Sequence, residues 1–227
     1  MRNVAILVDG GFYLKRCEKQ SEVGEVLSIG EVVSNLTAHC LKHLSNQKSN
    51  KKYINEPERL YRIFFYDCPP ITKKLHHPIT QRAIDLKKSP TALFRQGLHN
   101  QLRKTRNVAL RLGFLDEKNA RWTLKDPNKV KDLISGKITH TDIVEDDVVY
   151  HAQQKSVDMK IGLDIASMAY KKQVDKIILI SGDSDFVPAA KLARREGVEF
   201  ILDSMNAPIK PDLQEHIDGL NTTLPAK

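Results

Sequence analysis

The sequence IILISGDSDF, residues 177–186, changes character half-way along. Its first four residues form an uninterrupted aliphatic run, which is typical of a strand buried on both faces of a parallel sheet. Gly182 then permits a tight turn, and residues 187–195 continue with helical spacing. Asp183 and Asp185 therefore follow the carboxyl end of a central strand, the edge at which open α/β sheets bind their ligands.

A second buried strand is predicted at residues 3–8, and it ends at Asp9-Gly10-Gly11 before a helical pattern. An Asp before two glycines is ordinary turn chemistry when it stands alone. Here it follows a strand of the same kind as the Gly-Asp-Ser-Asp turn. Asp9 is therefore expected to be a third carboxylate at this edge.

A third strand is predicted at residues 60–66, and Asp67 follows it directly. Asp67 is a secondary candidate for the acidic group. Two further carboxylates lie in a helix expected to run from Ser156, its predicted N-cap, to about Tyr170. Asp158 and Asp164 are six residues apart, so they point about 120° away from each other. We expect Asp158 to face the site and Asp164 to support it.

The composition is that of a soluble α/β domain. The 227 residues are 41% hydrophobic and 28% charged, and no stretch approaches the roughly 18 apolar residues of a membrane span. The start shows no signal-peptide pattern, and the three cysteines fit neither a disulfide framework nor a zinc site. These features predict a cytoplasmic protein with one domain over residues 1–227.

Charge is distributed unevenly along the chain. Residues 42–137 hold 22 Lys and Arg against 8 Asp and Glu, whereas the rest holds 14 against 20. This basic middle suggests a polyanionic partner, although solvated basic helices would give the same count. Few aromatic residues interleave, so we expect contacts with phosphates rather than bases. The candidates, centred on a basic insertion around residues 71–147, are Lys73, Lys74, Arg82, Lys87, Lys88, Arg95, Arg103 and Lys104.

Three other segments of the sequence carry local predictions. His39 and His43 lie four apart on a predicted helix over residues 29–44, where a surface or groove placement is favoured over metal binding. Residues 116–147 are interpreted as an irregular connection in which Trp122 packs a small satellite core. A closing helix is predicted over residues 209–220.

The carboxylates Asp9, Asp158, Asp183 and Asp185 would repel one another if they converged without basic partners. A divalent cation would remove that repulsion, and ligands that are all oxygen suit Mg²⁺ or Mn²⁺. An acidic metal centre beside a basic surface is the arrangement that a nuclease needs.

These motifs resemble the NYN domain family of PIN-like nucleases. The similar segments are Val-Asp9-Gly-Gly, Phe-Tyr-Asp67-Cys-Pro-Pro, Lys155-Ser-Val-Asp158 and Ser181-Gly-Asp-Ser-Asp-Phe186. The resemblance implies a Rossmann-like (PIN-like) parallel sheet flanked by helices on both faces. It also implies Mg²⁺- or Mn²⁺-dependent cleavage of RNA at the four aspartates, with Asp164 and Ser181 near them as supporting residues. Many members carry Asn shortly after the first Asp, where this chain has Gly11-Phe12-Tyr13.

Two alternatives stay open. A phosphatase of the haloacid dehalogenase type ranks lower, because its chemistry requires a second Asp where this chain has Gly11. A non-catalytic nucleic-acid-binding or regulatory module of the same fold is the stronger rival. Whether single-stranded DNA is also a substrate stays open, and a homodimer would extend the basic groove.

Overall fold

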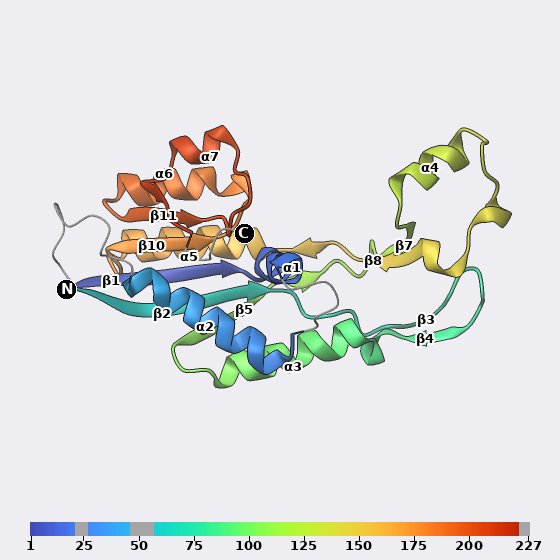
Figure 1. Ribbon diagram of the computed structural model, residues 1–227, viewed down its shortest axis with the longest axis horizontal. Helices are drawn as coiled ribbons and strands as arrows, with labels where there is room; N and C mark the ends of the chain where they lie inside the picture. The colour runs from blue at the N-terminus through green and yellow to red at the C-terminus, as the bar shows by residue number, and fades with distance from the viewer. Residues whose placement is uncertain (21–26, 46–56, 223–227) are drawn as a thin grey trace. The chain divides into compact units, whose positions relative to one another are not determined.

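The structure is a computed structural model that describes residues 1–20, 27–45 and 57–222. It divides into two compact units (Figure 1). The first unit comprises residues 1–67, 97–113 and 156–227, and the second comprises residues 68–96 and 114–155. Helix α3 (Pro90–Lys104) begins in the second unit and ends in the first.

The first unit is built on a six-stranded sheet in which every pairing is parallel. The strand order is β12-β11-β10-β1-β2-β5. The strands are β1 (Arg2–Asp9), β2 (Glu58–Asp67), β5 (Val108–Leu112), β10 (Lys176–Ile180), β11 (Glu199–Asp203) and β12 (Gly219–Leu220). The parallel sheet that the aliphatic runs predicted is thus confirmed.

The strand order reverses between β1 and β10. From β1 the chain adds β2 and β5 on one side, and it then returns to place β10, β11 and β12 on the other. Val8 of β1 is in register with Ile180 of β10, so the two strands end side by side. The crevice at such a switch point is where open α/β sheets bind ligands.

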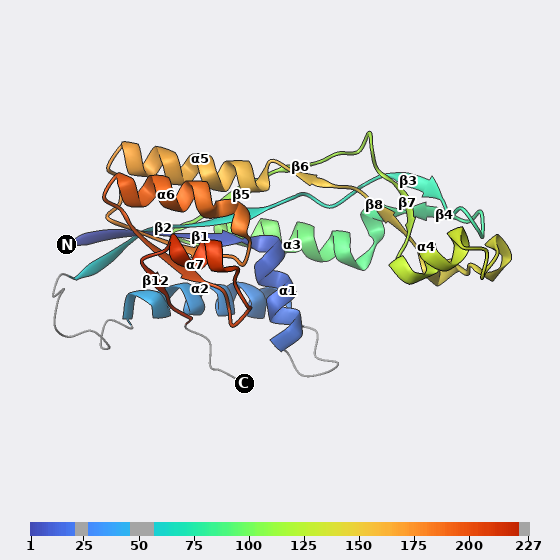
Figure 2. The same cartoon turned by 90° about the horizontal axis from the view of Figure 1, so that it is seen from above.

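Helices cover both faces of this sheet. They are α1 (Gly10–Gln20), α2 (Ile29–Ser45), α5 (Val157–Tyr170), α6 (Val187–Arg195) and α7 (Pro211–Glu215), with a 3₁₀ turn η5 (Ser184–Phe186) before α6. Figure 2 shows α5 and α6 on one face and α2 on the other. This arrangement confirms the predicted α/β class.

Burial explains why these segments fold as they do. Residues 4–8 of β1 are all fully buried, which is why the strand carries an unbroken aliphatic run. In α5 the buried residues include Val157, Ile161, Ile165 and Met168, which recur every three or four positions along one face. The two strands that carry Asp9 and lead to Asp183 therefore lie at the rigid centre of the unit.

The second unit consists of short antiparallel pairs. These are β3 (Lys74–His76) with β4 (Ala83–Asp85), β6 (Phe114–Leu115) with β9 (Gln154–Lys155), and β7 (Arg121–Leu124) with β8 (Val148–His151). The unit also holds α4 (Pro127–Ile134) and the 3₁₀ turns η2 (Leu86–Lys88), η3 (His140–Asp142) and η4 (Glu145–Asp147). Trp122 packs edge-on against His77 and Tyr150, with ring centroids 5.0 and 5.6 Å away.

Three local expectations were wrong. Residues 116–147 are not an irregular connection, because they contain β7 and α4, with Asp126 capping the helix by accepting a hydrogen bond from Asn128 N. The predicted closing helix is only the short α7, followed by β12. Ser156 precedes α5 in a left-handed conformation (φ 68°), and its side chain forms no capping hydrogen bond.

Candidate active site

Asp9 is the last residue of β1 and lies at the carboxyl edge of the sheet. Its Oδ1 accepts a hydrogen bond from the backbone N–H of Phe12 (3.1 Å), in the first turn of α1. Burial raises the pKa of the Asp9 carboxyl, and the charges of Asp158 and Asp183 raise it further, against hydrogen bonds from the backbone of Phe12 and Gly11. This carboxylate is therefore held by the fold in a position where its charge is unfavourable.

Ser181 connects Asp9 to the turn after β10. The buried Ser181 hydroxyl donates to Asp9 Oδ2 (3.5 Å) and accepts from the backbone N–H of Asp183 (3.3 Å). Asp183 in turn caps η5, because its Oδ1 accepts from Asp185 N at 3.0 Å. The local sequence Ser-Gly-Asp-Ser-Asp thus fixes its own backbone through side-chain hydrogen bonds.

Asp158 approaches the same group from the first turn of α5. Although the residue is exposed, partial loss of water around its carboxyl raises the pKa of Asp158, and the neighbouring charges of Asp183 and Asp185 add to that effect. Negative charges that raise the pKa of Asp9 and of Asp158 in this way lie near those two carboxyls. The fold therefore brings together the four aspartates, Asp9, Asp158, Asp183 and Asp185, which we call the acidic group.

The acidic group is open. Asp158, Asp183 and Asp185 are exposed, whereas Asp9 is partly buried. Among the residues that the structure describes, no three of these carboxylates have oxygen atoms within 4.8 Å of one another. A divalent cation would offset this repulsion, and a set of carboxylate oxygens suits a hard ion such as Mg²⁺ or Mn²⁺. The donor atoms present fit such an ion.

Comparison with known families assigns the chain. The sequence model of the NYN domain matches residues 72–218, which is nearly two thirds of the chain. The chain belongs to the NYN domain family. The match includes Asp158, Asp183 and Asp185, and it begins after Asp9, which joins this NYN site through the β1–β10 pairing.

Comparison with solved structures finds a protein with a similar overall fold. A protein of unknown function from Vibrio parahaemolyticus has a TM-score of 0.50 and 15% sequence identity, over 98% of this chain and 93% of that chain. At this identity the similarity concerns the fold alone. A solved structure from work on Sir2 enzymes has a TM-score of only 0.33 and 12% identity, over 97% and 86% of the two chains, and it carries no argument. The search of curated proteins found no match.

Two predicted supporting residues of the NYN site have other partners. Asp164 Oδ2 accepts hydrogen bonds from the Tyr66 hydroxyl (2.8 Å) and from Arg111 Nε (3.2 Å). Asp67 is buried, and its Oδ2 lies 2.8 Å from His99 Nε2. Both carboxylates thus join neighbouring elements of the first unit, α5 to β2 and β5 in one case and β2 to α3 in the other.

The predicted phosphate-binding residues fall in both units. Lys73, Lys74, Arg82, Lys87, Lys88 and Arg95 belong to the second unit, and Arg103 and Lys104 belong to the first. Some are engaged already, since Arg82 pairs with Glu145, and Lys73 donates to the backbone carbonyl of Glu117 (3.1 Å). In the described part of the chain, Lys74, Lys87, Lys88 and Lys104 form no ion pair.

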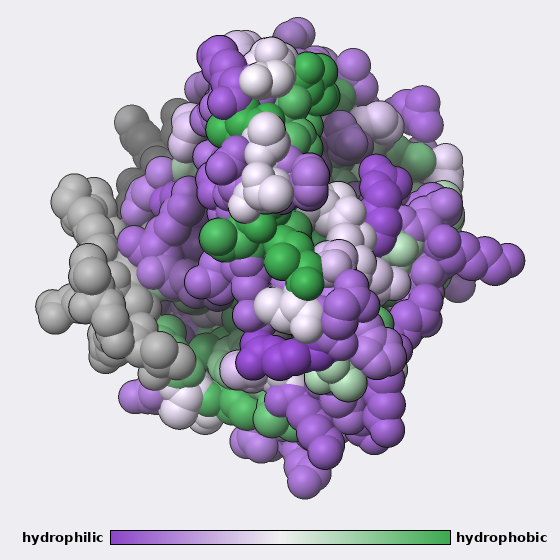
Figure 3. All heavy atoms as spheres, turned by 90° about the vertical axis from the view of Figure 1, so that its right-hand side faces the viewer, coloured by the Kyte–Doolittle hydropathy of each residue, from purple (hydrophilic) through white to green (hydrophobic). Residues whose placement is uncertain are grey.

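Hydrophilic side chains are common on the surface of the molecule and in the basic segment of the second unit. Figure 3 shows one face on which hydrophilic side chains predominate and apolar ones form small groups. Residues 68–96 alone hold six Lys and Arg against one Asp. Over residues 1–20, 27–45 and 57–222, no helix has the length and apolar character required to cross a membrane.

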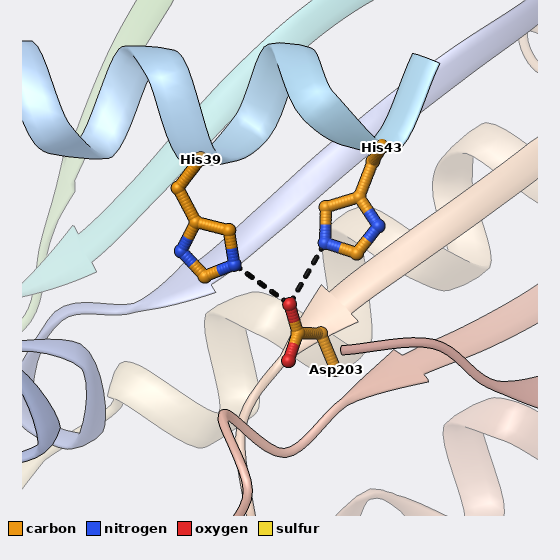
Figure 4. A group of neighbouring side chains, drawn as sticks. All are labelled: His39, His43 and Asp203. Carbon is orange, nitrogen blue, oxygen red and sulfur yellow. Dashed lines mark hydrogen bonds and ion pairs between the residues drawn. The ribbon is translucent and has the colours of Figure 1, made fainter. Parts of the chain in front are cut away.

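The placement of His39 and His43 differs from the prediction. Both side chains are buried, and both Nε2 atoms lie close to Oδ2 of Asp203, at 2.7 and 2.8 Å (Figure 4). The other carboxylate oxygen of Asp203 accepts from Met205 N (2.7 Å) and from the Thr222 hydroxyl (3.3 Å). The two histidines and Asp203, which we call the His–Asp–His latch, join α2 to the end of β11.

The side chains of the latch lie at hydrogen-bond distances from one another. Its Nε2 to Oδ2 distances are those of charge-assisted hydrogen bonds. Among the described residues, Nδ1 of His39 and Nδ1 of His43 are buried and have no hydrogen-bond partner, whereas a metal-bound histidine commonly donates its second N–H to an outer acceptor. Asp203 had one sequence signal: like Asp9 and Asp67, it follows a buried strand directly.

Proposed function

We propose that this NYN protein hydrolyses phosphodiester bonds in RNA in a reaction that requires Mg²⁺ or Mn²⁺. The observation that supports this most is the acidic group at the β1–β10 switch point, where loss of solvent and neighbouring negative charges raise the pKa of both Asp9 and Asp158. Such an arrangement costs stability unless a cation binds there. Functional sites are where perturbed carboxylates of this kind concentrate.

The four aspartates would hold the ion through carboxylate oxygens. When bound, a divalent cation supplies Lewis acidity towards a phosphoryl oxygen and lowers the pKa of a water molecule at neutral pH. The protein contributes the positions of the ligands. Ser181 orients Asp9, the N–H of Phe12 fixes the second Asp9 oxygen, and the Asp183–Asp185 turn is stabilised by its own hydrogen bond.

RNA binding would come from Lys and Arg contacts with phosphates. The candidates with no ion pair among the described residues, Lys74, Lys87, Lys88 and Lys104, are free to neutralise phosphate groups. Such contacts do not distinguish RNA from single-stranded DNA, so DNA is the natural comparison substrate. We also propose that the protein acts in the cytoplasm.

The test is cleavage of end-labelled single-stranded RNA by the full chain with Mg²⁺ or Mn²⁺. Asp183→Asn removes one proposed ligand and is expected to lower the rate by about 100-fold or more, since even outer-shell changes at metal sites cost about 10–100-fold. Asp212→Asn is the matched control, because Asp212 is an exposed carboxylate on α7 in the same unit. A chelator should abolish cleavage by the wild type and by this control.

The opposite outcome is equally informative. If the wild type binds RNA but does not cleave it with either ion, the non-catalytic module replaces the nuclease. If Asp183→Asn cleaves as fast as Asp212→Asn, the acidic group is not the reaction centre.

A further inference from the structure

Lys210 lies next to the acidic group, and no carboxylate among the described residues pairs with it. Its Nζ donates to the Ser184 hydroxyl at 3.0 Å, and Ser184 stands between Asp183 and Asp185 in the chain. Over the described residues, Lys210 forms no ion pair within 4.0 Å, although two carboxylates flank Ser184. A lysine that only neutralised the acidic group would be expected to pair with one of them.

The backbone of Lys210 is fixed although its side chain is exposed. Lys210 is the N-cap of α7, and its carbonyl accepts from Leu213 N (3.1 Å) and Gln214 N (3.2 Å). Pro208 and Pro211 restrict the chain on either side, and Leu213 anchors α7 in the core. The backbone that carries the Lys210 ammonium group is therefore held in place by the fold.

The donor inventory at this point suits an anion. A lysine ammonium has three N–H donors, of which Ser184 takes one, so two remain. The Ser184 hydroxyl accepts from Lys210 and keeps its own proton to donate. Both groups stand at η5, which runs directly into α6, so the positive end of that helix adds to their field.

We propose that Lys210 and Ser184 form a phosphate-binding site for the single-stranded substrate, beside the acidic group. This inference rests on the proposed function, because the phosphate it binds is one of the nucleic-acid backbone. It adds a contact that the basic middle of the sequence did not predict, since Lys210 lies in the acidic C-terminal part of the chain. The sequence signal was a lysine held between two prolines.

The test measures binding without cleavage. Fluorescence anisotropy of a labelled single-stranded RNA 12-mer, in chelator and over a series of salt concentrations, gives the affinity and its salt dependence. One lost phosphate contact should reduce the slope of log K against log salt by about 0.7 for a single strand. We expect this for Lys210→Met, with affinity falling by about 3- to 10-fold at low salt. Lys210→Arg should restore most of the binding.

Lys191→Met is the matched control, because Lys191 is an exposed lysine on the neighbouring helix α6. If Lys210→Met and Lys191→Met have the same slope, the phosphate site is wrong, whatever the cleavage assay shows. If the slope changes while the wild type never cleaves RNA, the site stands and the nuclease proposal fails. If the wild type does not bind the RNA, both the site and its substrate class are overturned.

Discussion

His39 Nε2 and Asp203 Oδ2 lie 2.7 Å apart although 164 residues separate them in the chain. His43 Nε2 reaches the same oxygen, so two consecutive turns of α2 are tied to one carboxylate at the end of β11. The backbone carbonyl of Asp203 also accepts from Ser181 N at 3.2 Å. Ser181 therefore connects the His–Asp–His latch to the active site, because its N–H donates to Asp203 and its hydroxyl donates to Asp9.

Asp203→Asn should destabilise the protein by about 3 kcal/mol, the scale for breaking a buried ionic group. All four neighbours of the carboxylate, His39, His43, Met205 N and the Thr222 hydroxyl, are placed to donate. The Asn amide has only one oxygen, so its NH₂ group, which is itself a donor, must point at two of these donors and leave them without an acceptor. Urea denaturation gives the free energy of unfolding, and Asp212→Asn should change it by less than about 0.5 kcal/mol. Equal effects of the two variants would contradict this account of the latch.

Acid should remove the contribution of the latch. Burial acts to raise the pKa of Asp203, but the hydrogen bonds from His39 and His43 outweigh it and hold the pKa well below its usual range. A carboxyl whose pKa is lowered by folding stabilises the protein above its unfolded pKa of about 3.8. That contribution is lost progressively as the pH falls below this value. Stability measured between pH 7 and pH 2 should fall steeply in the wild type and less steeply in Asp203→Asn; parallel curves would rule the linkage out.

The sequence predicted the parts of the site that are local in the chain. The turn after β10 is encoded by adjacent residues, an aliphatic strand followed by Gly182 and two aspartates, so the position of Asp183 could be read directly. The parallel sheet followed from the same runs. Asp9 was placed at the same edge because both strands are buried, and the β1–β10 register supports that reasoning.

The parts that were missed depend on contacts distant in sequence. His39 and His43 sit on a helix whose pattern is compatible with a surface, and only the approach of Asp203 makes them internal. In the second unit, β7 and β8 are four residues each and pair across an intervening helix, so neither has a strong periodic signal. Ser156 was expected to cap α5, but its left-handed backbone points the chain differently.

Asp9→Asn should stabilise the metal-free protein and abolish stabilisation by Mg²⁺. Burial and two nearby carboxylates raise the pKa of Asp9, so its charge opposes folding at pH 7 when no cation is bound. Wild-type protein at ten times the dissociation constant for Mg²⁺ should gain about 1.4 kcal/mol. Thermal unfolding with and without Mg²⁺ measures both effects. A wild type that gains nothing from Mg²⁺ or Mn²⁺, or an Asp9→Asn variant that gains as much as the wild type, would argue against Asp9 as a ligand.

Gly10→Ala should be among the most damaging single-methyl substitutions, because the backbone there has no room for a side chain. A Cβ at Gly10 would lie 2.6 Å from the carbonyl oxygen of Tyr66 and 2.6 Å from Cε1 of Phe65, and the carbonyl belongs to a central strand that cannot move alone. We expect the free energy of unfolding to fall by about 2–4 kcal/mol, which is at the upper end of the usual destabilisation by overpacking. Gly162→Ala is the matched control in α5, where a Cβ meets nothing within 4 Å and should instead stabilise the helix by about 0.5–1 kcal/mol. The free energies of unfolding of the two variants, measured by urea denaturation, show whether the loss at Gly10 comes from steric exclusion or from any substitution in a helix. If Gly10→Ala left the stability unchanged, α1 would be able to move away from β2, together with the backbone that positions Asp9.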